Sequence, residues 1–233
     1  MTGRTLVTSH RTTGKACWTV PVALIALSAI PLAAGTFRLV QLAGGPAVVP
    51  ADDRFAGFTA PVVVHIVGAA LYALVGVFQF VPRIRRHHPT WHRRAGRALV
   101  LAGLLVAGSA LMMTLLYARK PGTGDLLYVL RLLFGSAMIA CLVLGFAAVR
   151  RGDIVAHRAW MIRAYAIALA AGTQAFTEGI GAAIFGTGEL RGDLAKAAGW
   201  AINIAVAELA IRRRPIRRRL PPVITQSPAG APS

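Results

Sequence analysis

The chain has 233 residues, of which 56% are hydrophobic and 15% are charged, and its formal net charge is +18. Its mean hydropathy is +0.61, and several apolar runs reach the roughly 20 residues with which a helix crosses a bilayer core. The chain also has only two cysteines. This composition excludes a soluble globular domain, a disordered chain and a disulfide scaffold, and it predicts a polytopic membrane protein.

Six apolar runs predict an all-α bundle of about six transmembrane helices. They cover residues 17–37, 55–82, 98–118, 126–149, 159–185 and 194–211. The first run follows a basic leader and is longer than the apolar region of a cleaved signal, so we interpret it as a retained anchor that Pro31 kinks. The sixth run is the least regular, because Lys196, Asn203 and Glu208 interrupt it. Small residues recur along every run and allow transmembrane helices to approach closely.

Lysine and arginine are unequally distributed between the two sides of this six-span arrangement. The side with both termini holds 18 of the 26, the opposite side holds five, and three lie within spans. Because positive charge is retained in the cytoplasm, we expect both termini to be cytoplasmic. The chain then divides into a basic N-tail (1–16), a helical bundle (17–211) and a C-tail (212–233) that is basic and then rich in Pro and Ser and disordered.

The basic residues border the spans and do not form a folded module. Topology and attraction to anionic lipid at the cytoplasmic face therefore explain them, and no nucleic-acid partner is expected. The expected partner is the lipid bilayer. A homo-oligomer or a membrane partner protein stays open.

Ionisable side chains within a bilayer are costly, and their usual role is functional. Counting about 1.5 Å per helical residue, a first group of polar or sulfur-containing side chains shares one depth near the outer face. This outer layer consists of His65, Met112, Met113, Arg131, Gln174 and Glu178. Near the inner face lie His92, His157 and Arg163. Since His65 and His157 differ in depth by ~20 Å, they cannot bind one metal ion.

Haem b between helices is one hypothesis for these layers, because haem iron accepts His/His or His/Met axial pairs in bundle interiors. An outer haem would use His65 with Met112 (or its neighbour Met113), with Arg131 near a propionate. An inner haem would use His92 and His157. Proteins of this kind usually carry two histidines per haem inside the spans, and here only His65 lies well inside one.

Each of these residues also has a structural interpretation. In this interpretation, His65 only forms a hydrogen bond to a neighbouring helix. Arg131 and Glu178 form an ion pair with each other, because a charge in lipid is retained by pairing.

For two further residues the local sequence suggests a partner or a position. Arg163 extends to the interface from its place near the end of the fifth run. Glu208 precedes Arg212 by four residues, the favourable order for a pair on one helix.

Two stretches at the predicted membrane boundary carry a family resemblance. They are PTWHRRAGR (89–97), preceded by His65 and FQFVP (78–82), and HRAWMIRAYA (157–166). Together they resemble the bacterial membrane family catalogued as domain of unknown function 2306, over about residues 60–180. The resemblance implies a multi-pass inner-membrane protein in which His65, His92 and His157 match the family's histidines. It implies no activity, ligand or cofactor.

We therefore expect a multi-pass protein of the bacterial cytoplasmic membrane with a non-catalytic role as a scaffold, accessory or lipid-interacting component. One alternative is a membrane oxidoreductase that holds haem b or a quinone through His65, His92 and His157. Another is a pathway for a small solute or protons through His65, Arg131 and Glu178. Hydrolase patterns such as HExxH are absent from the sequence.

Overall fold

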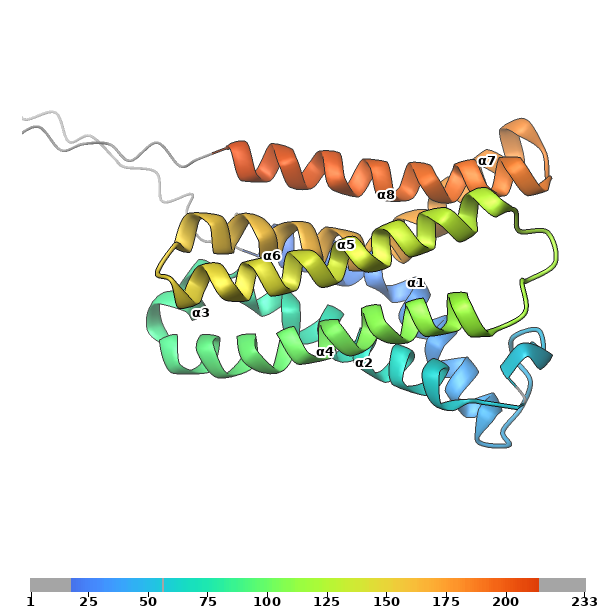
Figure 1. Ribbon diagram of the computed structural model, residues 1–233, viewed down its shortest axis with the longest axis horizontal. Coiled ribbons are helices and arrows are strands. Elements are labelled where there is room, and N and C mark those ends of the chain that lie inside the picture. The colour runs from blue at the N-terminus through green and yellow to red at the C-terminus, as the bar shows by residue number, and fades with distance from the viewer. Residues whose placement is uncertain (1–17, 56, 214–233) are drawn as a thin grey trace, which may run out of the picture.

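A computed structural model describes residues 18–55 and 57–213. The predicted N-tail (1–16) and nearly all of the predicted C-tail lie outside these residues. The described part consists of helices joined by short connections (Figure 1) and contains no strand. The helices are α1 (Thr19–Leu42), the 3-10 turn η2 (Asp53–Phe55), α2 (Ala60–Gln79), α3 (Pro82–His87), α4 (Pro89–Leu116), α5 (Asp125–Arg150), α6 (Ile154–Ala168), α7 (Ala170–Phe185) and α8 (Glu189–Arg212).

Five of these helices are each long and apolar enough to cross a membrane: α1, α2, α4, α5 and α8. The fifth predicted span is divided into α6 and α7, which meet at Leu169 at an angle of 44° and pass the same test only as a pair. Counted as one bent span, they bring the total to six. The predicted all-α membrane bundle is thus confirmed. α4 also begins earlier than expected, because the basic segment 89–97 is helical and continuous with the third span.

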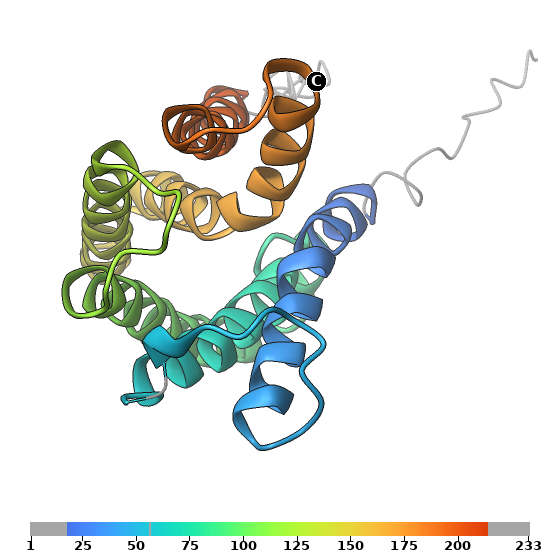
Figure 2. The same cartoon turned by 90° about the vertical axis from the view of Figure 1, so that its right-hand side faces the viewer.

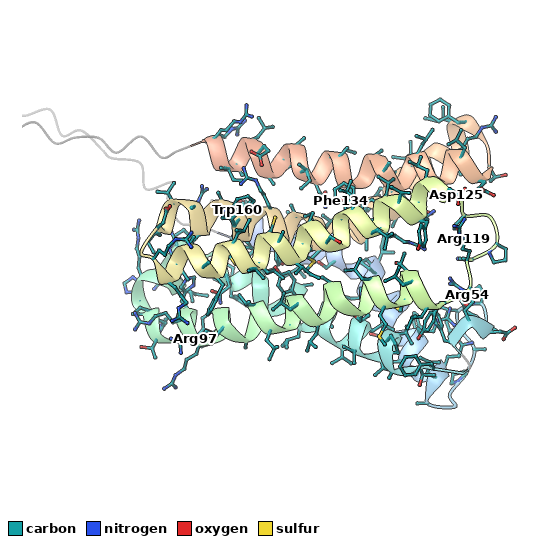
Figure 3. All side chains as sticks on the ribbon, in the orientation of Figure 1. Arg54, Arg97, Arg119, Asp125, Phe134 and Trp160 are labelled. Atoms are coloured by element: carbon teal, nitrogen blue, oxygen red, sulfur yellow. The ribbon has the colours of Figure 1, made fainter. Side chains whose placement is uncertain are left out.

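The spans lie side by side, each in contact with its neighbours. α1 packs against α2 and α7, α2 against α4, α4 against α5, and α8 against α5, α6 and α7. Figure 2 shows this arrangement end-on. We call the end with the connections 43–59, 117–124 and 186–188 the Arg54 end, and the end with residues 80–88 and 150–153 the Arg97 end (Figure 3).

The α1–α7 contact depends on a glycine and a proline. A Cβ atom on Gly172 would lie 2.1 Å from the Leu27 carbonyl oxygen, so no larger residue fits there. This carbonyl is the one that Pro31, four residues later in α1, leaves without a helical N–H partner. Gly172 therefore packs on a carbonyl that proline has freed, and the two helix backbones come into direct contact.

The tightly packed part of the bundle lies from its middle toward the Arg97 end. Val77, Leu142 and Ala164 are fully buried there. The hydroxyl of Tyr165 donates a hydrogen bond to the Ala73 carbonyl at 2.7 Å. A core of large apolar and aromatic side chains thus joins α2, α4, α5 and α6. The half at the Arg54 end is packed differently.

Candidate functional site

A cavity of about 620 Å³ occupies the Arg54 half of the bundle. α1, α2, α4, α5, α7 and α8 all contribute to its wall, and most of the lining is apolar. The α6–α7 junction around Leu169 also lines it, and Arg54, Phe55 and Tyr117 line it near the connecting loops. The bend between α6 and α7 therefore shapes the cavity, because it carries α7 toward α1 and away from α5.

The structure brings four residues of the predicted outer layer to this one cavity: His65, Met113, Arg131 and Gln174. The other two do not line it. The side chain of Met112 is 40% exposed on the outside of the bundle, so of the two methionines considered as haem ligands only Met113 adjoins the space beside His65. Glu178 does not line the cavity either, because its side chain is directed to Lys196 on α8.

The predicted ion pair between Arg131 and Glu178 was wrong. The Glu178 Oε2 atom lies 2.6 Å from the Lys196 Nζ atom, because α7 and α8 form a tight helical hairpin that places Lys196 beside it. Within residues 18–55 and 57–213, Arg131 has no ion-pair partner and no hydrogen bond. Asp193 and Glu178 are close enough to act on its charge only at longer range.

His65 forms the interhelical hydrogen bond that the sequence suggested. Its Nδ1 atom lies 3.1 Å from the Val106 carbonyl oxygen and 3.3 Å from the Ser109 hydroxyl, both on α4. Because a carbonyl oxygen only accepts, Nδ1 carries the ring proton and donates it. Nε2 then holds the free lone pair. His65 therefore offers the cavity an acceptor, or a ligand for iron.

The ionisable lining of the cavity is cationic. Arg54, Arg131 and Lys196 line it, and no Asp or Glu does within the described part of the chain. Lys196 is paired with Glu178 on α7. Arg131 is therefore the uncompensated charge of the cavity.

Arg54 is also compensated, in this case from its own loop. Its Nη2 atom lies 2.6 Å from the Asp52 Oδ2 atom. The side-chain hydrogen bonds between them lower the pKa of the Asp52 carboxyl and raise the pKa of Arg54. The Asp52–Arg54 pair thus fixes a cation at the cavity mouth.

One buried carboxylate was missed by the sequence analysis. Asp193 on α8 is 1% exposed, and its Oδ2 atom accepts hydrogen bonds from the backbone N–H groups of Gly124 and Leu127, each at 3.0 Å. It caps the N-terminus of α5 from another helix and compensates the positive end of the helix dipole. The sequence around Asp193 is mixed, with Arg191 and Lys196 close to it, so its role became visible only through the α5–α8 contact.

The histidines of the inner layer lie near each other at the Arg97 end. The Nδ1 atom of His157 lies 2.9 Å from the Gly145 carbonyl oxygen. His92 is within electrostatic range of His157, and its buried Nδ1 atom has no hydrogen-bond partner; the Gln79 Nε2 atom is buried and unpartnered too. The described residues hold no group of three His, Cys, Asp or Glu side chains that fits a metal ion.

Arg163 does not extend freely to the interface as expected. Its Nε and Nη2 atoms lie 2.6 Å and 3.2 Å from the two carboxylate oxygens of Glu208, and its guanidinium lies over the Trp160 ring at 4.9 Å. Glu208, which the sequence suggested as a partner of Arg212, forms its close ion pair with Arg163, because packing of α6 against α8 gives it a bidentate partner. Arg212 acts on the Glu208 charge only at longer range.

The family model described as "Predicted membrane protein (DUF2306)" matches residues 62–211, which is more than half of the chain. The chain belongs to this family. The match runs from α2 to α8, so it includes the sixth span, which the two sequence stretches did not reach. No curated protein and no solved structure matches the chain. The protein is thus a multi-pass membrane protein in contact with lipid, and its family description names no activity.

Proposed function

We propose that this protein is a non-catalytic component of the bacterial cytoplasmic membrane that binds an amphipathic anion in the cavity of the Arg54 half. One observation carries the proposal: the cavity is lined by three cations and no carboxylate, and Arg131 has no partner among the described residues. An unpaired cation in a poorly hydrated place is costly. A bound anion compensates it.

The remainder of the lining suits an apolar chain. Leu32, Ile66, Phe134 and Trp200 belong to the wall, on four different helices. The volume of about 620 Å³ is in the range of small-molecule sites. A ligand with a hydrocarbon part along these side chains and a charged head near Arg131 matches both properties of the cavity.

The distribution of Lys and Arg supports an orientation for this ligand. The Arg97 end carries the basic segments 82–97 and 150–158, and the Arg54 end carries few basic residues. Under the rule that positive charge stays inside, the Arg54 end faces away from the cytoplasm. The ligand then comes from the outer half of the bilayer.

The test is a thermal-shift series on the purified full chain in a neutral detergent. Dodecyl phosphate, dodecanol and dodecyltrimethylammonium share one chain and differ in head charge. We expect only dodecyl phosphate to raise the melting temperature, by a few degrees at saturation. Arg131→Gln removes the shift. Arg191→Gln, the same change at an arginine that does not line the cavity, retains it. Equal shifts for all three compounds, or a shift that survives Arg131→Gln, contradict the proposal.

A second candidate is a membrane oxidoreductase with haem b or a quinone in the same cavity, supported by the free Nε2 lone pair of His65. Met113 lies on α4, the helix to which His65 is hydrogen-bonded, so it does not face His65 from the opposite wall. A reduced-minus-oxidised spectrum with a haem band that His65→Ala abolishes favours this candidate over the first. A proton pathway has less support, since Glu178 does not line the cavity and is paired with Lys196.

A further inference from the structure

A second, smaller pocket adjoins the cavity at the Arg54 end. It has a volume of about 20 Å³ and is lined by three arginines, Arg54, Arg119 and Arg131. Arg54 and Arg131 line the large cavity as well. The two pockets therefore share part of their walls, and Figure 3 shows Arg54 and Arg119 at the same end of the bundle.

The three guanidinium groups come from three separate segments and are held by different contacts. Arg54 donates to the Asp52 carboxylate through Nε at 2.7 Å and Nη2 at 2.6 Å. Arg119 donates to Asp125 and lies over the Tyr128 ring at 4.9 Å. Neither Asp52 nor Asp125 lines either cavity. Arg54 and Arg119 are thus held by aspartates that are not themselves part of either lining.

Arg131 is the exception among the three. It lies on the wall between the two cavities and has no ion pair or hydrogen bond within the described ranges. Its charge is uncompensated, whereas Arg54 and Arg119 are each paired with an aspartate. Three planar, multidentate donors around one small space are the arrangement that proteins use for phosphate groups.

Three hydroxyl groups of the pocket do not compete as donors, whereas the hydroxyl of Tyr128, which also lines it, donates to no group within the described ranges. The hydroxyl protons of Tyr117, Thr114 and Thr123 are already donated to the backbone carbonyls of Phe58, Ala110 and Lys120. Arg54 already donates once from each nitrogen, to Asp52 and to the Ala118 carbonyl, so its second Nη protons remain. These protons, the other two guanidinium groups and the Tyr128 hydroxyl are the donors for a ligand.

A carboxylate has two oxygens and one charge, whereas a phosphate monoester has three terminal oxygens and nearly two charges. Because Arg54 and Arg119 already have carboxylate partners, the match lies in the number of acceptor oxygens, and a phosphate monoester offers one terminal oxygen to each of the three guanidinium groups.

We propose that the ligand's head is a phosphate monoester, bound where Arg54, Arg119 and Arg131 meet, with its alkyl or isoprenyl chain in the large cavity. This inference rests on the proposed function and adds the class of head group. A pocket of about 20 Å³ holds one water-sized group. One terminal phosphate oxygen therefore enters it, and the rest of the head, the ester oxygen and the chain stay in the cavity.

The test measures affinity by calorimetry on the full chain in neutral detergent, with dodecyl phosphate, dodecanoate and inorganic phosphate as probes. We expect dodecyl phosphate to bind at least about tenfold more tightly than dodecanoate, and inorganic phosphate to bind far more weakly than either. Arg119→Gln lowers the preference for phosphate over carboxylate to about twofold. Arg191→Gln, at an arginine outside both cavities, leaves the preference unchanged.

The outcomes separate this inference from the proposed function. Equal affinities for dodecyl phosphate and dodecanoate overturn the phosphate inference and leave the amphipathic anion in place. A preference that survives Arg119→Gln overturns the arginine pocket as its cause. Inorganic phosphate binding as tightly as dodecyl phosphate makes the ligand a free anion and overturns the inference. No binding of either dodecyl compound overturns the proposed function itself.

Discussion

Arg163 and Arg131 both lie well inside spans of this bundle, and their surroundings differ. Arg163, in the Arg97 half, forms a bidentate ion pair with Glu208 and lies over the Trp160 ring. Arg131, in the Arg54 half, faces a cavity and has no such partner in the part of the chain that the structure describes. The same residue type thus holds two helices together in one half and offers an uncompensated charge in the other.

The two halves differ in packing as well as in charge. Toward the Arg97 end, fully buried side chains such as Leu142 and Ala164 leave little space. Toward the Arg54 end the helices surround a volume of about 620 Å³. Binding sites commonly sacrifice stability, so we assign most of the stability to the first half and the ligand to the second.

The largest expected effect concerns which side of the membrane each half faces. A reporter that is active only outside the cytoplasm is fused after residue 122, at the Arg54 end, or after residue 220. The excess of Lys and Arg at the Arg97 end predicts an active fusion at 122 and a silent one at 220, nearly all-or-none. An active fusion after residue 220 contradicts the orientation and places the ligand on the other side.

The next largest effect is on the α1–α7 contact that closes the cavity. Gly172→Ala places a Cβ atom against the Leu27 carbonyl oxygen, at a distance of 2.1 Å before any movement. We expect a loss of about 3 kcal/mol in the free energy of unfolding, measured in mixed micelles. Gly179→Ala is the matched control on the same helix, since nothing lies near its added Cβ. It is expected to be neutral or slightly stabilising. Similar losses for both variants contradict the close-contact account.

The ion pair of the Arg97 half gives a smaller effect. Arg163→Met leaves Glu208 without its partner, and because both side chains are nearly a third exposed we expect a loss of about 2 kcal/mol. The double variant Arg163→Met, Glu208→Leu recovers much of that loss, because no unpaired charge remains. If the double variant is as unstable as the sum of the two single ones, the pair is not a structural unit.

The smallest of these effects concerns the inner histidines. His92 lies within electrostatic range of His157. A double-mutant cycle of His92→Ala and His157→Ala is expected to show a coupling of about 0.5–1 kcal/mol in unfolding. Strictly additive changes indicate two independent helix ends and remove any basis for a shared site.

The sequence predicted the spans but not the partners of their charged residues. The length of an apolar run decides whether it crosses a bilayer, so six runs were recognisable. The partner of Glu178 depends on how α7 and α8 are rotated about their axes. Lipid is as apolar as the bundle interior, so hydrophobic periodicity contains little information on this rotation. The pairs Glu178–Lys196 and Arg163–Glu208 therefore became visible only in the structure.

The candidate site shows the same limit. Depth along the helices grouped His65, Met113, Arg131 and Gln174, and the structure places all four in the wall of one cavity. Depth did not show that Met112 faces outward. The bend at Leu169 was also missed, since the residues Ala168–Leu169–Ala170 contain no proline or glycine to mark a break in a continuous apolar run.

The most direct test of the account is the melting temperature of Arg131→Leu beside that of the wild type, both delipidated, with and without dodecyl phosphate. If Arg131 is kept for a ligand, removing its uncompensated charge raises the melting temperature of the empty protein by about 2–4 °C, and dodecyl phosphate no longer adds to it. A lower melting temperature for the empty variant, with the shift from dodecyl phosphate intact, would show that Arg131 stabilises the fold and does not bind the ligand.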